Sequence, residues 1–442
     1  MKRTVRTESL LWTQWEETLH KRRNRIAVIA AESGASWTFQ RLHDTALCWS
    51  DRLASFAPGQ RIAFRLRNGP AWLALFLGMQ RRGLTAVPLD GGLPDEGCCE
   101  TAWRLEAQAL YMSNVWHSLH WKKKEPLAHP GVACLKLTSG SDAHPKEVAC
   151  RAEHLLADGR QIITSMRLRP ADVNLAAIPL GHSYGLGNLV LPLILQGTAM
   201  VCAVSHLPRQ LLDWIERYKV TVFPAVPALL RVLAALPPGT NMDSMRTVIS
   251  AAAILPPAVA QAFHQRYGLK VHNFYGSSET GGICYDRTGS ASLQGRSVGK
   301  PLDGVSVTVK AGRITVRSPA VATRGHHWRV PDTGEWNSRD ELVLHGRIGQ
   351  LANIGGRKVH PLEVEQLLRT LPGVTDASVW LRTAHDHDIL AAAVETSWSR
   401  PEIEKALACH LPAWKLPRYY IVAAELPRNP RGKLDLAVLR KM

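Results

Sequence analysis

Short apolar segments alternate with segments of helical pattern along most of this sequence. Residues 61–66 form a strand pattern, residues 71–82 a helical pattern that ends at Gly83, and residues 85–89 the next strand pattern. Glycine commonly follows the last turn of a helix, so Gly83 marks that end. Strands separated by helices of about 10–15 residues are typical of parallel sheets joined by crossover helices. The sequence therefore predicts an α/β fold in which parallel or mixed sheets are flanked by helices. Further strands are expected at residues 172–179, 199–204, 220–224, 247–250 and 271–275.

The pattern changes near residue 295 to short alternating strands. The run VSVTVKAGRITVRS predicts a hairpin that turns at Ala311–Gly312. After Gly346–Arg347, strand and helix patterns mix in a shorter segment, with a helix expected at 361–371. A chain of 442 residues suits one large domain and one small one. We therefore predict a large N-terminal domain at 1–345, which includes a β-rich subdomain, and a small, mobile α+β domain at 346–442.

The formal net charge of +17 favours anionic partners. The Lys and Arg residues are dispersed, and the sequence has no zinc-finger, RNA-recognition or basic-zipper pattern. We therefore expect no nucleic-acid partner. Dispersed positive charge suits a nucleotide, coenzyme A or an acidic carrier protein, although it also suits a basic surface that keeps a protein in solution.

The eight cysteines are scattered singly, except for Cys98–Cys99, and show neither a CxxC pair nor a metal-binding spacing. This arrangement favours reduced thiols over a disulfide framework or a metal cluster. The N-terminal segment 1–20 lacks the apolar core of a signal peptide. The uncharged run around 183–205 is interrupted by Gly, Asn and Pro, which predicts a buried helix–turn–strand rather than a membrane span. We therefore expect a cytoplasmic protein without a membrane span.

A hydroxyl-rich loop, LTSGSDAHPKEV, follows an apolar run at residues 137–148. Its hydroxyls and backbone N–H groups can surround phosphate oxygens, its glycine permits close backbone approach, and its lysine adds a positive charge. A cluster of Ser, Gly, Asp and Pro is also typical of an ordinary turn. The candidate phosphate-binding residues are Thr138, Ser139, Gly140, Ser141 and Lys146.

Two further segments carry candidate chemistry. In HNFYGSSETGG, residues 272–282, Tyr275 can stack on a base and Glu279 can bind Mg²⁺, which prefers one or two carboxylates together with substrate phosphates. In LPRNPRGKLD, residues 426–435, Lys433 lies in a loop rich in Pro, Gly and Asn. Alone, the first segment also fits a strand-to-loop turn, and a single loop lysine is ordinarily a solvated charge.

These segments form an ordered series together with GEWNSRD at 334–340 and GRIGQLANIGGRKVHPLEVE at 346–365. Their order, spacing and content resemble the adenylate-forming (AMP-binding) superfamily, in particular a compact member of its acyl- and aryl-CoA synthetases. The resemblance extends from about Trp37 to Leu439, nearly the whole chain. It implies an acid–thiol ligase, in which ATP activates a carboxylic acid as an acyl-adenylate with release of pyrophosphate and a thiol then accepts the acyl group.

The resemblance also implies residue roles and cofactors. Lys433 and Glu279 would act in catalysis, with Glu279 holding Mg²⁺, and Arg347 would assist near the domain hinge. The positions implied around ATP are Thr138, Ser139, Gly140, Ser141, Lys146, Tyr275, Gly276, Ser278 and Asp340. Of these, Asp340 would bind the ribose hydroxyls. The positions implied at the hinge and the thiol tunnel are Gly349, Gly355 and Gly356. The implied cofactors are ATP, Mg²⁺ and either coenzyme A or the phosphopantetheine of a carrier protein.

The sequence departs from the family pattern in two places. In the phosphate loop, Asp142 stands where the family usually has a hydroxyl residue, and Ala143 and Glu147 stand where it usually has glycines. Extra carboxylates beside a triphosphate are unfavourable unless they point away or meet a cation. A catalytically weakened protein that only binds a nucleotide or acyl ligand therefore stays open as an alternative. The second departure is the short spacing from Asp340 to Arg347, which requires a sharp bend if both contact one ribose.

The segment AAIPLGHSYGLG, residues 176–187, resembles the stretch of acyl- and aryl-CoA ligases that borders the acid. It carries His182 and no carboxylate for a substrate ammonium, which favours an aryl or fatty acid over an amino acid, although His182 also fits a packed core histidine. Phe274, Ala251 and Ala252 stand where many family members have glycine, and their bulk predicts a short pocket for an aryl or short acyl acid. Coenzyme A is the expected acceptor, and a stand-alone enzyme that loads a carrier protein is the alternative.

Overall fold

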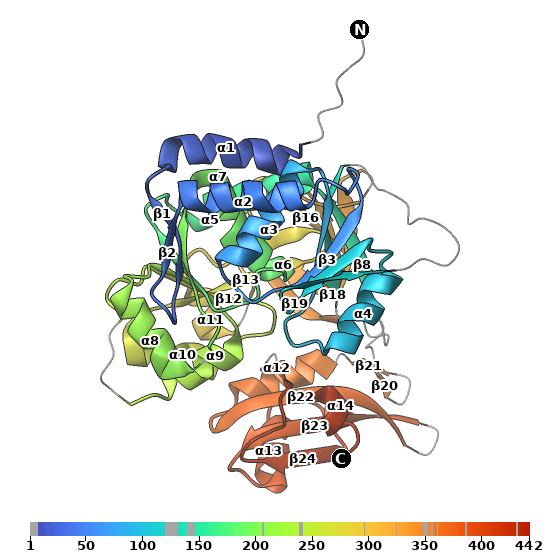
Figure 1. The fold of residues 1–442 in the computed structure, drawn as a ribbon. Coiled ribbons are helices and arrows are strands. Elements are labelled where there is room, and N and C mark those ends of the chain that lie inside the picture. Colours follow the sequence, from blue (N-terminus) through green and yellow to red (C-terminus); the bar gives the residue numbers. More distant parts are fainter. Residues whose placement is uncertain are drawn as a thin grey trace.

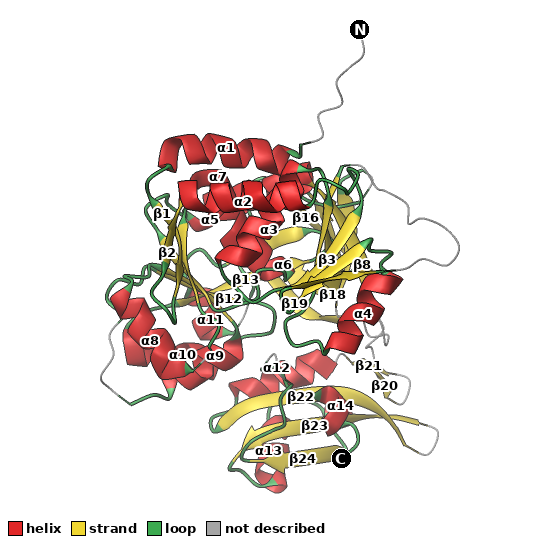
Figure 2. Ribbon diagram, viewed as in Figure 1, coloured by secondary structure: helices red, strands yellow, loops and turns green. Residues whose placement is uncertain are grey.

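Two large sheets and the helices around them form the N-terminal part of the chain, residues 8–347 (Figures 1 and 2). The C-terminal part, residues 352–442, lies against one side of it. The computed structural model describes residues 8–119, 131–138, 146–205, 207–237, 242–295, 297–323, 325–347, 352–354, 357–359, 361–384, 387–429 and 432–442.

The first sheet is mostly parallel and changes direction only at its edges. Its strands are, in spatial order, β15 (Lys300–Pro301), β14 (Gly281–Tyr285), β13 (Val271–Ser277), β12 (Thr247–Ser250), β11 (Val222–Ala225), β9 (Val173–Ala176), β10 (Ala199–Cys202), β1 (Ile26–Ala30) and β2 (Ser36–Thr38). The strands of the second sheet are β6 (Val115–Ser118), β5 (Ala109–Met112), β3 (Arg61–Arg65), β4 (Thr85–Pro88), β7 (Val132–Thr138) and β8 (Lys146–Arg151). Its central strands are parallel and its edge pairs are antiparallel. The expected α/β fold with mixed sheets is therefore confirmed.

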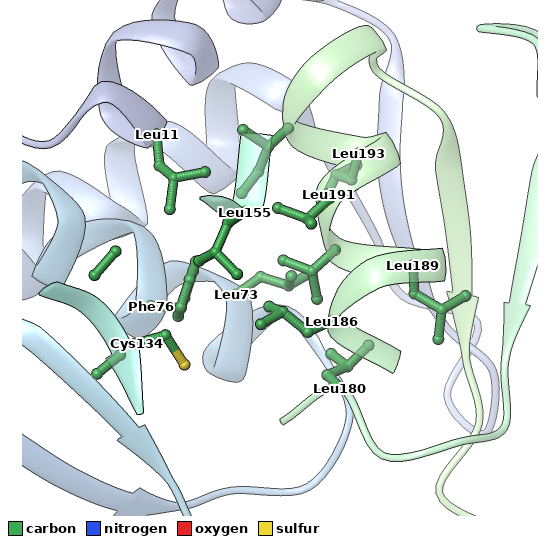
Figure 3. Close-up of a cluster of buried hydrophobic side chains, with 14 of the residues drawn as sticks. Leu11, Leu73, Phe76, Cys134, Leu155, Leu180, Leu186, Leu189, Leu191 and Leu193 are labelled. Atoms are coloured by element: carbon green, nitrogen blue, oxygen red, sulfur yellow. The ribbon is translucent and has the colours of Figure 1, made fainter. Parts of the chain in front are cut away.

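Helices cover both sheets, and several of them lie between the two (Figure 2). Those whose buried residues join the core between the sheets are α1 (Leu10–Arg22), α2 (Phe39–Arg52), α3 (Pro70–Arg81), α5 (Ala152–Met166), α6 (Ser183–Gly185), the π-helix η1 (Leu186–Val190) and α7 (Leu191–Gln196). The others are α4 (Asp95–Arg104), α8 (Pro208–Arg217), α9 (Pro227–Ala234), α10 (Pro257–Tyr267) and α11 (Ser290–Gln294). Figure 3 shows how leucines from α3, α5 and α7 meet in this core.

A four-stranded antiparallel sheet completes the N-terminal part and forms the expected β-rich region. Its strands are β16 (Ser306–Lys310), β17 (Arg313–Arg317), β18 (His327–Trp336) and β19 (Leu342–Arg347). The predicted turn at Ala311–Gly312 is confirmed, because Lys310 pairs with Arg313 and both turn residues have positive φ. Two successive residues of positive φ match the right-handed twist of a hairpin.

The C-terminal part is an α+β unit with its own buried core. Its strands are β20 (Ala352–Ile354), β21 (Arg357–Val359), β22 (Val374–Ala384), β23 (His387–Thr396) and β24 (Tyr419–Ala423). Its helices are α12 (Pro361–Thr370), α13 (Arg400–Ala408), the 3₁₀-helix η2 (Ala413–Lys415) and α14 (Leu436–Leu439). Helix α12 packs against α10 and β19 of the N-terminal part. The predicted boundary at 345–346 falls inside β19 and stays a prediction.

Most expected elements in the described residues agree closely with the observed ones, but the strand expected at 172–179 is shorter. Only β9, which ends at Ala176, pairs within the sheet. The carbonyl oxygens of Ala176 and Ile178 accept hydrogen bonds of 3.0 and 2.8 Å from the Asn68 side chain. The chain therefore leaves the sheet there and continues along the edge of the cavity described below. The uncharged run that follows forms helices and then β10, as expected, and no helix in the described residues is long and apolar enough to cross a membrane.

Candidate active site

A cavity of about 3360 Å³ lies between the N-terminal and C-terminal parts. One wall follows the carboxyl ends of parallel strands, among them β4, β9 and β12, and β18 and β19 add to it. Residues 378–382 and the loop that carries Lys433 form the opposite wall. Ligands of open α/β sheets bind in the crevice beyond the carboxyl ends of the strands. This cavity is therefore the candidate active site.

Strands β7 and β8 hold the two ends of the predicted phosphate loop. Thr138 pairs with Lys146 in antiparallel register, and Lys146 lines the cavity. Glu147 forms an ion pair with Arg61, with 3.2 Å between Oε2 and NH1. Successive side chains of a strand point to opposite faces, so Glu147 faces away from Lys146. One of the two unfavourable carboxylates thus points away and meets a cation. The loop residues that lie outside the described part are Ser139, Gly140, Ser141, Asp142 and Ala143.

Glu279 lies on the cavity wall in the tight turn between β13 and β14. Ser277 Oγ and Thr280 Oγ1 are 3.0 Å apart, and Ser277 Oγ also accepts a 3.3 Å hydrogen bond from the Thr280 N–H. Gly276 and Gly281 approach so closely that a Cβ on Gly276 would lie 2.6 Å from the Gly281 oxygen. These contacts hold the turn in a single shape and present the Glu279 side chain to the cavity.

A buried ion pair supports this turn from behind. Lys136 Nζ and Asp158 Oδ2 are 3.9 Å apart, and both side chains are only 3% exposed. Asp158 Oδ1 accepts a 2.9 Å hydrogen bond from the Gly282 N–H. Burial raises the pKa of Asp158, and Lys136 and the Gly282 N–H oppose that rise. Because Lys136 belongs to β7 and Asp158 to α5, the pair connects the strand that leads into the phosphate loop with the turn that carries the candidate Mg²⁺ ligand. The sequence patterns did not single out either residue.

Tyr275 and Asp332 meet at the cavity from two different sheets. The Tyr275 hydroxyl donates a 2.6 Å hydrogen bond to Asp332 Oδ2, and both residues line the cavity. Asp332 lies on β18 and is the cross-strand partner of Arg347, the last residue of β19. An aromatic ring beside a carboxylate can hold a base and its ribose together, since the carboxylate has further acceptor sites for hydroxyl groups.

The structure places Asp340, which the resemblance puts on the ribose, outside the cavity wall, and its role stays a prediction. It lies in the exposed turn between β18 and β19 with φ of 57° and is absent from the cavity wall. The short spacing from Asp340 to Arg347 is therefore the distance along the chain from the turn of this hairpin to the end of its second strand. Asp332 lies on the first strand of that hairpin, opposite Arg347, so the longer spacing from Asp332 to Arg347 is the sequence signal that would have made it a candidate.

The hinge and tunnel positions of the prediction are mostly outside the described residues. Arg347 ends β19, and its main chain is paired with β18, but its side chain is not described. The positions outside the described part are Gly349, Gly355 and Gly356. Their roles therefore stay predictions.

The residues expected to border the acid lie together on one side of the cavity. His182 precedes α6 and lines the cavity. Next to it, Ser183 Oγ lies 2.7 Å from Ser278 Oγ, which connects the acid side with the segment expected to touch phosphate. Ala251 is buried, whereas Ala252 is exposed and has φ of 68°, a left-handed conformation that glycine adopts more easily.

Two aromatic rings close the inner end of this acid region. The Tyr184 and Phe274 rings are stacked with centroids 5.9 Å apart. The Tyr184 hydroxyl reaches the carbonyl oxygens of Ala225 and Ile249 at 3.3 and 3.2 Å. The main chain of two strands therefore holds this buried ring at the cavity wall.

Lys433 reaches the cavity from the C-terminal part. Its main-chain oxygen accepts a 2.8 Å hydrogen bond from the Asn429 N–H, and its own N–H donates to the Asn429 side chain at 3.2 Å. A Cβ on Gly432 would lie 2.9 Å from the Cβ of Ala228 on α9, so the loop touches the N-terminal part directly. The structure thus brings Lys433 and Glu279, from different parts of the chain, to one cavity.

Comparison with known proteins identifies the family. Residues 15–125 and 101–323 match the AMP-binding enzyme family. The chain belongs to this family. It is 27% identical to a sulfoacetate–CoA ligase of Cupriavidus necator over 92% of this chain and 93% of that protein. It is 24% identical to a 3,4-dihydroxybenzoate–[aryl-carrier protein] ligase of Bacillus anthracis over 87% and 91%. The fold resembles ATP-bound MatB from Rhodopseudomonas palustris with a TM-score of 0.85, 21% identity and 98% coverage of both chains.

Membership in the AMP-binding family, together with similarity along nearly the full length of named ligases, identifies an enzyme. It activates a carboxylic acid as an adenylate and passes the acyl group to a thiol. Enzymes of this family use ATP and Mg²⁺, and coenzyme A or a carrier protein accepts the acyl group.

Replacing Lys136 by Met leaves the Asp158 carboxylate buried without its counter-charge. We expect Lys136→Met to lower the free energy of unfolding by about 3–5 kcal/mol, the cost of breaking a buried pair from one side. The double variant Lys136→Met, Asp158→Asn keeps an acceptor for the Gly282 N–H and is expected to recover most of that loss. Urea unfolding measures both, and an unchanged value for Lys136→Met would contradict the pairing.

Asp332 and Asp340 provide a matched test of which carboxylate binds the ribose hydroxyls. Asp332→Asn removes the charge that receives hydroxyl groups, so the KM for ATP is expected to rise roughly tenfold or more, as for a lost charged hydrogen bond. Asp340→Asn changes only an exposed turn and is expected to leave the KM for ATP unaltered. Initial rates over a range of ATP concentrations measure both KM values. A larger rise in Asp340→Asn than in Asp332→Asn would assign the ribose contact to Asp340.

Proposed function

We propose that this enzyme uses ATP and Mg²⁺ to convert an aryl or short acyl carboxylic acid to its acyl-adenylate, releases pyrophosphate, and transfers the acyl group to coenzyme A. The observation that carries the proposal is that Lys433 from the C-terminal part and Glu279 from the N-terminal part line one cavity. The order of sequence segments that resembles acyl- and aryl-CoA synthetases supports it. The proposed location is the cytoplasm, which the eight free cysteines support.

The first step requires two anions to meet, because the acid's carboxylate attacks the α-phosphorus of ATP. In the proposal, Lys433 contacts both the carboxylate and the α-phosphate and offsets their repulsion as charge builds up. Glu279 suits Mg²⁺ because a single carboxylate beside bound phosphates is the environment that this ion prefers. When bound there, Mg²⁺ would neutralise charge on the phosphates.

The proposed nucleotide contacts come from four segments. Tyr275 packs on adenine, and Asp332 takes the ribose hydroxyls in place of Asp340. Ser278 and Lys146 contact phosphates, together with the hydroxyls and N–H groups of the loop between β7 and β8. Arg347 assists from the end of β19. Each of these segments contributes to the cavity wall or borders it.

The proposed size of the acid rests on the aromatic side chains of Tyr184 and Phe274 beside the segment expected to border the acid. The Tyr184 ring, whose hydroxyl donates to carbonyl oxygens of two strands, and the stacked Phe274 ring both line the cavity, and their bulk favours a short acid over a long chain. His182, Ala251 and Ala252 line the remaining space. No acidic side chain stands in the segment 176–187, which favours an acid without an amino group.

The acceptor is the less constrained half of the proposal. Coenzyme A is favoured by the resemblance to coenzyme A synthetases, and the net charge of +17 suits its phosphates. An acidic carrier protein is the alternative, since an aryl-carrier protein ligase is among the similar proteins. In either case Gly349 is proposed at the hinge, and Gly355 and Gly356 along the thiol path.

An acid panel with hydroxylamine as the trapping agent tests the proposal. Aryl and short acids are expected to give hydroxamates that depend on ATP, and long-chain acids are expected to give none. Adding coenzyme A is expected to divert the product to a thioester, whereas diversion only by a carrier protein would favour the alternative acceptor. Trapping of long-chain acids alone would contradict the proposed pocket.

A further inference from the structure

A cluster of buried charges joins the two parts of the chain beside the cavity. Arg231, on α9 of the N-terminal part, lies 3.0 Å from Asp376 Oδ2 and 3.4 Å from Glu395 Oε1. Its NH2 group also donates to the Thr375 oxygen at 3.0 Å. Within the C-terminal part, Arg428 contacts the same two carboxylates at 3.1 and 2.9 Å. Asp376 and Glu395 therefore each bind Arg231 from the N-terminal part and Arg428 from the C-terminal part, and Asp376 also binds Arg369.

With Glu365, Asp376 and Glu395 all ionised, the charges of this cluster balance only when Arg231 is included. Burial raises the pKa of Glu365, and Arg369 opposes that rise. The members in the C-terminal part are three carboxylates and two guanidinium groups: Glu365, Asp376, Glu395, Arg369 and Arg428. The side chains of Asp376 and Glu395 are only 8% and 6% exposed. A buried carboxylate without a counter-charge is unfavourable, and Arg231 supplies the missing positive charge. Burial opposes ionisation of Asp376, but Arg369, Arg231 and Arg428 outweigh it and lower the pKa of this carboxyl.

The same cluster is the base of the loop that carries Lys433. Arg428 forms a bridge with Leu434 across this loop and reaches the Gly432 oxygen at 3.5 Å. At the tip, Gly432 lies against Ala228, which is on α9 as Arg231 is. Helix α9 therefore contacts the loop at its tip and, through the two shared carboxylates, at its base. Every side-chain polar contact recorded for Arg231 in the described residues goes to the C-terminal part.

We propose that Arg231 is a positioning residue for Lys433, which it holds in the cavity by fixing Asp376, Glu395 and the base of the lysine loop against α9. Arg231 acts through this cluster and does not touch the reacting atoms. The inference rests on the proposed function, in which Lys433 acts while the acyl-adenylate forms. Arginine suits this role because its planar group binds two carboxylates and a carbonyl oxygen at once, which a lysine cannot do in the same geometry.

The first test replaces Arg231 by Gln in the full chain. Misplacement of a catalytic group by about 1 Å can cost roughly 100-fold in rate, so we expect kcat for acyl-adenylate formation, followed by hydroxamate trapping, to fall by about 10- to 100-fold. The KM for ATP is expected to change little, since Tyr275 and Asp332 lie on the N-terminal part. Arg209→Gln, at an exposed position on the neighbouring helix α8, is the matched control and is expected to leave kcat unchanged. An unaltered kcat in Arg231→Gln would overturn the inference.

The second test separates positioning from a direct contact, because Arg231 also borders the cavity. If Arg231 acts through Lys433, the double variant Arg231→Gln, Lys433→Ala is expected to be no slower than Lys433→Ala alone. Multiplicative losses would mean that Arg231 acts by itself on a ligand, which would overturn the proposal. Arg231→Lys, which keeps the charge but not the planar group, is expected to fall between wild type and Arg231→Gln. This variant serves as the test if Arg231→Gln does not fold.

A third readout does not depend on activity. Hydrogen exchange of the full chain is expected to become faster in Arg231→Gln for residues 427–435, where the Asn429 and Gly432 N–H groups are internally bonded, and to stay unchanged in α3. Equal exchange in both proteins would overturn the inference even if the enzyme is active. If instead the wild-type protein traps no acid at all while the exchange changes as expected, the proposed function fails and the link between Arg231 and the lysine loop remains.

Discussion

The repulsion between a carboxylate and the phosphates of ATP is the constraint on which the arrangement of this chain depends. Positive charge has to reach the point where the carboxylate meets the α-phosphate from more than one direction. The edge of a single sheet rarely supplies it from all of them. In the proposed site, Lys146 and the Mg²⁺ that Glu279 would hold bring positive charge from the N-terminal part, whereas Lys433 brings it from a loop of the C-terminal part. The proposed site is complete only when the two parts are held against each other. The interface between them is therefore as necessary for the proposed reaction as the cavity is.

Two clusters of buried charge stabilise the elements that carry these residues. Lys136 and Asp158 connect the strand before the phosphate loop to the turn with Glu279. Arg231 connects the N-terminal part to the base of the lysine loop. Buried ion pairs contribute little net stability compared with apolar packing, but breaking one from a single side is costly. We propose that the two clusters serve to fix where Glu279 and Lys433 stand, while apolar packing, as in the core of Figure 3, stabilises the fold.

The sequence predicted the local structure and the order of the site segments well, because both depend on residues close together in the chain. The helix expected at 361–371 and the hairpin at Ala311–Gly312 agree with α12 and the β16–β17 turn. Spacing alone does not reveal that Asp340 lies in the turn of a hairpin and that Asp332 lies on its first strand, beside Tyr275, so Asp332 could be proposed for the ribose only from the structure. Arg231 could not be found from sequence either, since its partners are more than a hundred residues away and no local pattern marks it.

The most direct test of the account is acid-dependent exchange of labelled pyrophosphate into ATP, measured with the wild-type chain and with Lys433→Ala. The exchange requires the acyl-adenylate to form and to reverse, and it needs no acceptor thiol. The account predicts clear exchange with an aryl or short acid, and a loss of roughly 100- to 1000-fold in Lys433→Ala, the scale of removing one group that stabilises charge in the transition state. Exchange that is equally fast in Lys433→Ala would contradict the account.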